Sequence, residues 1–165
     1  MSRLGTPIDE FTRETATARR HLERILEDRL DWRPHAKSST AGALGGHLAE
    51  CARWAEHVFA GDGLDVDPSA YVSIRPGSVD EMLAGFDAQV EAAREAMARS
   101  EDRGANRPWQ MRLRGETLFE KDRESAFRDL SLSHLVHHRG QLTVNLRLLD
   151  VPLVGTCGPT ADQRA

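Results

Sequence analysis

Three of the chain's seven histidines lie within five residues, at His134, His137 and His138. If this segment is helical, His134 and His138 lie one above the other, because residues four apart share a helix face. Two imidazoles in this arrangement can bind one metal ion, through bonds of about 2.0–2.1 Å in the case of zinc. His137 lies about 60° to one side of His134 and is less well placed. The spacing therefore predicts a metal site at His134 and His138.

The segment matches the zinc-protease pattern only in part. Those enzymes carry H-E-x-x-H, in which the glutamate is the general base. The sequence here is H-L-V-H-H, with Leu135 at the position of the glutamate. The protease mechanism is therefore excluded.

His47 is the candidate for a third ligand, since it lies beside Leu48 on the inward stripe of a predicted helix. Gly45 and Gly46 precede it, and Gly140 follows His138. A glycine inside a helix costs about 1 kcal/mol relative to alanine. We therefore expect a neighbouring helix or a ligand to approach closely at this level.

A di-iron centre of the ferritin type would require Glu-x-x-His pairs on two helices. The nearest pattern is the reversed H-L-A-E of His47 and Glu50, and the last helix offers no matching glutamate. The sequence therefore favours one metal ion over two.

Several polar residues near these histidines are candidates for outer partners of the ligands or for the lining of a pocket. Gln141 and Asn145 continue the face of His134 at one-turn spacing, although polar residues are equally ordinary on a half-buried helix. Glu50 and His137 belong to the same group. Cys51 falls on a core stripe and is interpreted as packing. The other histidines, His21, His35 and His57, have no comparable partners and are expected in solvent.

Four helical stretches must position these side chains. Three-four spacing of apolar residues predicts helices over about 8–25, 41–60, 79–103 and 122–149. The last carries leucine and valine on most sides and is expected to be the most buried. The 61–77 connection exceeds the usual link between helices, so it is either a lid over a site or a disordered span. Alternating residues in 106–120 allow a short hairpin before the last helix. The predicted fold is an all-α, antiparallel four-helix bundle.

Composition excludes several classes of protein. The 165 residues suit a single domain, and the net charge of −4 comes from well-mixed acidic and basic residues. No basic block points to nucleic acid, and no apolar run approaches the roughly 20 residues that span a bilayer. The N-terminus lacks the apolar stretch of a signal peptide, and two cysteines are too few for a disulfide scaffold. We therefore expect a cytoplasmic protein without nucleic-acid or membrane partners.

Three segments of the sequence resemble the DinB-like superfamily, and they do so in the family's order. DWRPHAKSSTAGALGGHLAE (31–50) is similar to a "W-x-P…S…L-x-x-H" entry into the second helix. HLVHHRGQLTVNLRLLDVP (134–152) is similar to the signature "H-x-x-x-H-R-G-Q-L". GPTADQ (158–163) is similar to a terminal "G-P-S-x-D", with Thr160 where serine is commoner.

The resemblance implies a single DinB-like four-helix bundle over 1–165, with a metal triad at His47, His134 and His138. It also implies a divalent ion such as nickel, zinc, iron or manganese, and often a homodimer. Some members resemble enzymes that transfer or isomerise groups with a low-molecular-weight thiol.

We therefore expect a metalloenzyme that activates a thiol or water toward a small-molecule substrate. Thiol-dependent S-transfer or isomerisation ranks first and hydrolysis second. The pocket would lie between the second and fourth helices, under the 61–77 connection and the C-terminal tail. Neither Glu50 nor Asp129 can be named as a general base from the sequence, so no catalytic residue is assigned.

Two alternatives stay open. One is a non-catalytic, metal-stabilised binding or stress-response module, whose site would be closed by a fourth protein ligand such as Glu50, His137 or the tail. The other is a plain helical dimer whose histidines bind nothing. An open coordination position would favour the enzyme over the module.

Overall fold

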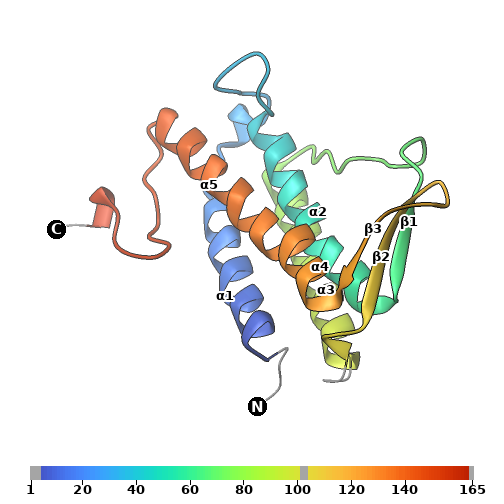
Figure 1. The fold of residues 1–165 in the computed structure, drawn as a ribbon. Helices are drawn as coiled ribbons and strands as arrows, with labels where there is room; N and C mark the ends of the chain where they lie inside the picture. The colour runs from blue at the N-terminus through green and yellow to red at the C-terminus, as the bar shows by residue number, and fades with distance from the viewer. Residues whose placement is uncertain (1–4, 101–103, 164–165) are drawn as a thin grey trace.

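The computed structural model describes residues 5–100 and 104–163 (Figure 1). Three long helices come first along the chain, and the final helical stretch consists of two α-helical parts joined by a π-helical turn. The helices are α1 (Gly5–Leu22), α2 (Ala41–Ala60), α3 (Val79–Arg99), α4 (Arg123–Phe127), the π-helical turn η3 (Arg128–Leu132) and α5 (Ser133–Leu148). The strands are β1 (Gly63–Val66), β2 (Pro108–Leu113) and β3 (Glu116–Asp122).

The predicted all-α class is wrong, because a three-stranded mixed sheet packs beside the helices (Figure 1). β2 and β3 form the antiparallel hairpin that the alternating residues allowed. Its two-residue turn has positive φ at Arg114 (49°) and Gly115 (85°), as a type I′ turn requires.

The strand β1 is the element that the sequence did not indicate. It lies within the 61–77 connection and pairs in parallel with β2, from Gly63 opposite Gln110 to Val66 opposite Leu113. Four residues are too few to show a clear alternation, and their pairing partner lies far along the chain. The connection is therefore neither a simple lid nor a disordered span, since its first part is a strand.

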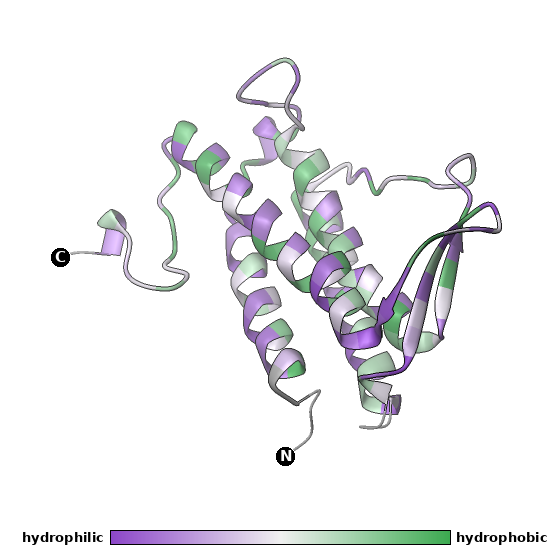
Figure 2. Cartoon of the chain, viewed as in Figure 1, coloured by the Kyte–Doolittle hydropathy of each residue, from purple (hydrophilic) through white to green (hydrophobic). Residues whose placement is uncertain are grey.

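The core lies between the inward faces of the helices. Figure 2 shows hydrophilic and hydrophobic residues alternating along each helix, as amphipathic helices require. Buried residues with helical spacing include Phe11 and Ala18 on α1, Leu48 and Ala55 on α2, and Phe86 on α3. These faces agree with the spacing in the sequence.

The prediction that the last helix is the most buried is wrong. α2 occupies that position, with Leu44, Leu48, Cys51 and Val58 among its buried residues. On α5, by contrast, Val136, Val144 and Leu148 are exposed. The apolar residues of α5 therefore include an outward face that the described part of the chain leaves exposed.

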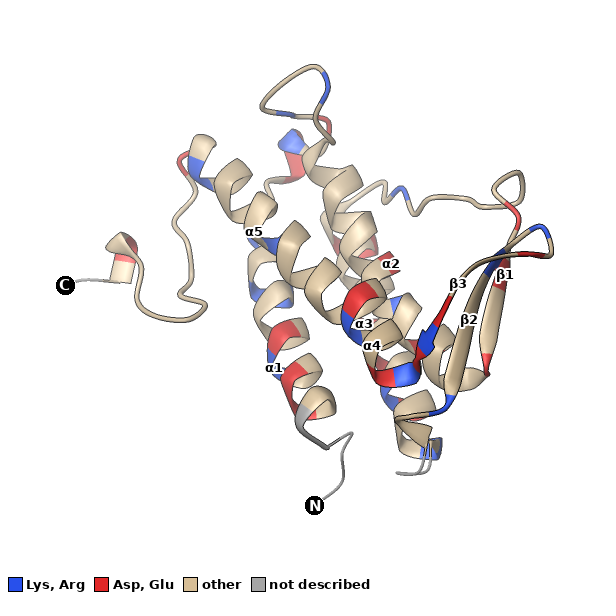
Figure 3. Ribbon diagram, viewed as in Figure 1, with Lys and Arg blue, Asp and Glu red and all other residues tan. Residues whose placement is uncertain are grey.

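Charges are mixed over the molecule. Figure 3 shows lysine and arginine interspersed with aspartate and glutamate, on α1 as well as around the strands. None of the helices in residues 5–100 and 104–163 has an apolar stretch long enough to cross a membrane.

The C-terminal tail is held by polar contacts with α1 and with the end of α5. The Asp162 carboxylate accepts hydrogen bonds from Arg147 Nη1 (3.1 Å) and from the Leu153 backbone N–H (2.9 Å). His21 is fully buried, and its two ring nitrogens face Thr17 O (2.9 Å) and Val154 O (3.2 Å). The expectation that His21 lies in solvent is therefore wrong, because the tail covers it.

Candidate metal centre

Three histidines from two helices meet at one point between α2 and α5. His47 lies on α2, and His134 and His138 lie one turn apart on α5. The ring centroid of His47 lies 5.0 Å from that of His134 and 4.4 Å from that of His138. The His134 and His138 centroids are 4.7 Å apart. The three rings thus lie side by side, but the residues whose donor atoms all lie within 4.8 Å of one another are His47, Cys51 and His134, without His138.

Each of the three rings has its Nδ1 atom engaged by an oxygen on the same helical stretch. These oxygens accept hydrogen bonds, so each neutral ring carries its hydrogen on Nδ1 and presents a lone pair at Nε2. Ligating histidines are held in this way by an outer carboxylate or carbonyl. The three contacts are His47 Nδ1 to Glu50 Oε2 (2.6 Å), His134 Nδ1 to Leu130 O (3.3 Å) and His138 Nδ1 to Gln141 Oε1 (2.8 Å).

The free nitrogens of His47 and His134 have the separation expected of two ligands of one ion. His47 Nε2 and His134 Nε2 lie 3.2 Å apart. Two nitrogen ligands of a tetrahedral zinc ion, with bonds of about 2.0–2.1 Å, are separated by about 3.3 Å. Burial lowers the pKa of His134 and that of His138, which favours the neutral, metal-binding form of both rings. The donor set therefore suits a divalent ion.

The π-helical turn η3 sets the direction in which α5 presents its histidines. The Ser133 N–H bonds to Arg128 O, five residues back, so the turn holds one more residue than an α-helical turn. Phe127 and Leu132 are both buried although five residues separate them. The extra residue therefore keeps both on the core side and rotates α5 so that His134 and His138 face α2.

Glu50 joins the histidine cluster to the 61–77 connection. Its side chain is 3% exposed and accepts hydrogen bonds from the Ile74 N–H (2.7 Å) and from the Tyr71 hydroxyl, besides that from His47. Burial alone would raise the pKa of this carboxyl, but the bonds from His47, Ile74 and Tyr71 outweigh it, so the pKa is lowered. An ionised Glu50 thus holds the second half of the connection, 71–74, against the site.

The glycines before His47 allow this close packing. A Cβ atom at Gly46 would lie 2.2 Å from Ile74 O, and one at Gly45 would lie 2.0 Å from Met82 Sδ. The expected close approach is therefore confirmed at these two glycines. It is wrong at Gly140, where no described atom lies within 4 Å of the position of a Cβ.

Cys51 is the residue that the sequence analysis missed. Its Sγ atom and one nitrogen each of His47 and His134 lie within 4.8 Å of one another, close enough to hold a metal ion together. Cys51 is fully buried, and burial raises the pKa of its thiol to about 12. The spacing of four residues from His47 is the same signal that paired His134 with His138, and it could have identified Cys51.

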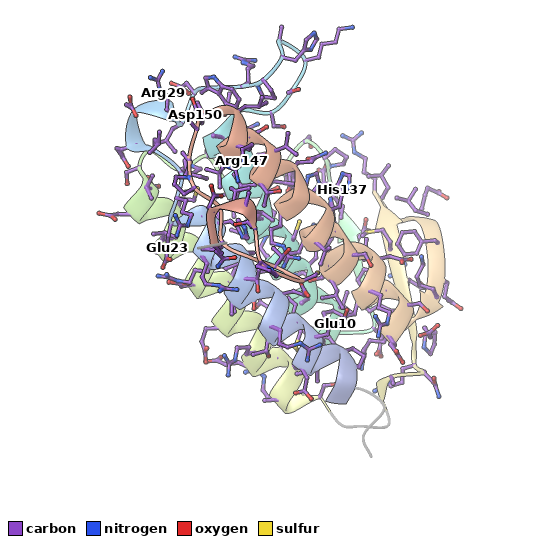
Figure 4. The ribbon with its side chains drawn as sticks, turned by 90° about the vertical axis from the view of Figure 1, so that its left-hand side faces the viewer. Glu10, Glu23, Arg29, His137, Arg147 and Asp150 are labelled. Carbon is purple, nitrogen blue, oxygen red and sulfur yellow. The ribbon has the colours of Figure 1, made fainter. Side chains whose placement is uncertain are left out.

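The remaining candidates lie around the cluster. Figure 4 shows His137 on the side of α5 away from α1, and its Nε2 accepts a hydrogen bond from the Gln141 amide (3.0 Å). Gln141 thus bridges His137 and His138. Asp129 is exposed and pairs with Lys121 (2.7 Å), so it is engaged elsewhere.

A cavity of about 490 Å³ adjoins the cluster at His138 and Gln141, and Asn145 also lines it. Its other walls come from residues 34–39 and from the first turn of α2. None of the tail residues that the structure describes, up to 163, lines this cavity as predicted; residues 34–39 do.

Comparisons with known proteins give a consistent result. The model of the DinB superfamily matches residues 10–142. A comparison with curated proteins gives no significant match. The fold is similar to the crystal structure of a DinB-like protein from Bacillus cereus, with a TM-score of 0.73 and 18% identity, over 94% of this chain and 99% of that one. A DinB-like protein from Bacillus subtilis gives a TM-score of 0.70 and 14% identity, over 98% and 100% of the two chains. At these identities the structural likeness concerns the fold.

Proposed function

Because the chain belongs to the DinB superfamily, we propose that it is a metalloenzyme in which His47, His134 and His138 hold one divalent ion. One observation carries the proposal. The His47 and His134 rings face each other through Nε2 atoms 3.2 Å apart, while their Nδ1 atoms are held by Glu50 and Leu130. Two facing lone pairs at this distance repel unless a proton or a cation lies between them.

The chemistry follows from the charge of the donor set. A divalent ion bound by three neutral imidazoles keeps its full charge and an open position, and it lowers the pKa of a bound water or thiol toward neutrality. Glu50 and Gln141 orient His47 and His138 through their Nδ1 atoms. The cavity at His138 gives a small substrate access to the site. S-transfer or isomerisation with a low-molecular-weight thiol ranks first and hydrolysis second.

Nickel, zinc, iron and manganese are the candidate ions, because imidazole binds several divalent ions of the first transition row. A homodimeric state and a cytoplasmic location belong to the same proposal. Both come from the resemblance and from composition.

The second candidate function is a non-catalytic, metal-stabilised module, and Cys51 is the observation that favours it. If its thiolate joined the histidines, four protein ligands would close the site, as in structural zinc sites. The two functions thus differ in whether a coordination position stays open.

The experiment is a metal-dependent thiol-transfer assay. Protein loaded with zinc or nickel is incubated with a panel of low-molecular-weight thiols and 1-chloro-2,4-dinitrobenzene, from which a thiolate displaces chloride. We expect a rate that chelators and His134→Ala abolish and that His137→Ala retains, since His137 is held outside the cluster by Gln141. Equal rates for the loaded, metal-free and His134→Ala proteins would contradict catalysis at this centre.

A further inference from the structure

We propose that the cavity beside His138 binds a small molecule with a carboxylate group and a short apolar body. Lys37 would pair with the carboxylate, and Asn145 would bind a second polar group nearer the metal centre. The identification of this molecule as the substrate rests on the proposed function, whereas the binding itself does not.

The cavity has the size and position of a ligand site. Its volume of about 490 Å³ falls within the roughly 300–1,000 Å³ of small-molecule pockets. It lies between the 34–39 segment, the first turn of α2 and α5, so that one end reaches His138. The lining residues are Pro34, Lys37, Ser38, Ser39, Leu44, His138, Gln141, Val144 and Asn145.

Asn145 is a polar side chain of the cavity lining that has no hydrogen-bond partner among the described residues. It is 6% exposed, and its amide makes no hydrogen bond with any residue in the described part of the chain. Gln141, one turn earlier, is different, because both ends of its amide are engaged by His137 and His138. Asn145 is therefore available to a ligand in the cavity.

The charge of the lining selects an anion. Lys37 is its one cation, and no described carboxylate lines it. Lys37 forms no ion pair within residues 5–100 and 104–163, while the other lysine, Lys121, is paired with Asp129. The hydroxyls of Ser38 and Ser39 stand beside Lys37 and can donate hydrogen bonds to a carboxylate.

The backbone at the start of α2 does not supply this recognition. The first three N–H groups of the helix already donate to acceptors of the protein, so side chains must recognise the anion. These bonds are Ala41 N to Trp32 O (2.9 Å), Gly42 N to Leu30 O (2.9 Å) and Ala43 N to Thr40 Oγ1 (3.1 Å).

The apolar part of the lining defines the body of the ligand. Pro34, Leu44 and Val144 give the cavity, which Lys37 and His138 also line, its apolar walls. A ligand with its carboxylate at Lys37 would therefore place a short apolar body along these walls. Its opposite end would lie at His138, where the proposed reaction takes place.

Hexanoate tests this inference, with 1-hexanol as its uncharged counterpart. Binding is followed by chemical shifts in ¹⁵N-labelled protein, both metal-free and zinc-loaded, and the metal content of each sample is measured. We expect shifts at Ser38, Ser39 and the Asn145 side-chain amide, and affinity about fivefold higher for hexanoate than for hexanol, as suits a partly exposed ion pair.

Lys37→Gln should remove this preference, and Lys121→Gln, the matched control, should keep it. 6-Hydroxyhexanoate, whose hydroxyl adds a second polar group, should bind roughly threefold to tenfold more tightly than hexanoate, and Asn145→Ala should remove that gain.

Equal affinity for hexanoate and hexanol would overturn the inference, as would a Lys37→Gln variant that behaves like Lys121→Gln. If protein that holds zinc gave such a result, the proposal of a metal centre would still stand. Protein that holds no metal but prefers hexanoate through Lys37 would support the inference and contradict the metalloenzyme.

Discussion

At the scale of single residues, Glu50 connects more parts of the site than any ligand does. It orients His47, accepts the Ile74 N–H and accepts the Tyr71 hydroxyl, and it does so while almost wholly buried. The negative charge of a carboxylate also raises the basicity of the imidazole that it holds. Glu50 is therefore a positioning residue for the proposed ion.

Replacing Glu50 by glutamine should lower metal affinity by about 10- to 100-fold, because the amide can keep the shape but not the charge. Competition with a chromophoric chelator measures the affinity. Asp129→Asn removes an exposed carboxylate on η3 that pairs with Lys121, and it should leave the affinity unchanged. Equal affinities of wild type and Glu50→Gln would show that Glu50 does not act through His47.

Whether the proposed metal ion keeps an open coordination position depends on Cys51. Its thiol is buried with a pKa raised to about 12, so the apo protein holds it protonated on the core side of the cluster. We predict that cobalt-loaded protein lacks the near-ultraviolet charge-transfer band of a thiolate ligand, and that Cys51→Ala keeps its cobalt. A thiolate band that disappears in Cys51→Ala would instead favour the closed, non-catalytic module.

At the scale of elements, the site depends on how closely the 71–74 segment approaches α2. Gly46 permits this approach, since a Cβ there would lie 2.2 Å from a backbone oxygen that cannot rotate away. Gly140 on α5 has open space around it in the described structure. The two glycines therefore offer a matched pair.

Gly46→Ala should destabilise the protein by about 1–3 kcal/mol, the usual cost of overpacking. Gly140→Ala should stabilise it by about 1 kcal/mol, because alanine is the better helix former and meets no obstacle. Urea unfolding of the two variants beside wild type measures both free energies. A neutral Gly46→Ala would mean that Ile74 does not lie against α2 as described.

The elements also show what the sequence can predict and what it cannot. Helical spacing located the long helices, and in the structure Ser78 caps α3, its side chain accepting a hydrogen bond from the Glu81 N–H. β1 was not predicted, because its partner β2 lies more than forty residues away along the chain. Local spacing carries no information about such distant pairing. The π-helical turn was not predicted either. The five-residue spacing of the two buried residues Phe127 and Leu132 is a signal for it.

The histidine cluster was accessible to sequence reasoning because its key spacing is local to one helix. The third member, His47, needed the glycines beside it and the family resemblance. Cys51 was interpreted as packing because a small apolar residue suits its buried position equally well.

At the scale of the whole molecule, the burial of one histidine and the partial burial of three others disfavour their protonated forms. Burial is the largest cause that lowers the pKa of His21, His57, His134 and His138 below the ordinary 6.5. The unfolded chain therefore binds more protons than the folded one once the pH falls below about 6.5. The contribution of these histidines to folding stability is fully present above that pH and decreases as the pH falls from about 6.5 toward the lowered pKa values.

Metal-free protein should therefore unfold at a lower temperature at pH 5.5 than at pH 7.5. Thermal unfolding followed by circular dichroism checks this at both pH values. His134→Gln should reduce the difference, and His35→Gln, which alters an exposed ring, should not. A melting temperature that is equal or higher at pH 5.5 would contradict the conclusion that the folded protein binds fewer protons at its histidines than the unfolded chain.

The central claim is that His47, His134 and His138 hold one divalent ion, and metal content tests it most directly. Untagged protein purified without chelator should contain about one divalent ion per chain. His47→Ala, His134→Ala and His138→Ala should each lose it while circular dichroism shows intact helices, and His137→Ala should keep it. Wild-type protein that holds no metal after reloading with nickel or zinc, or three variants that all retain it, would contradict the account.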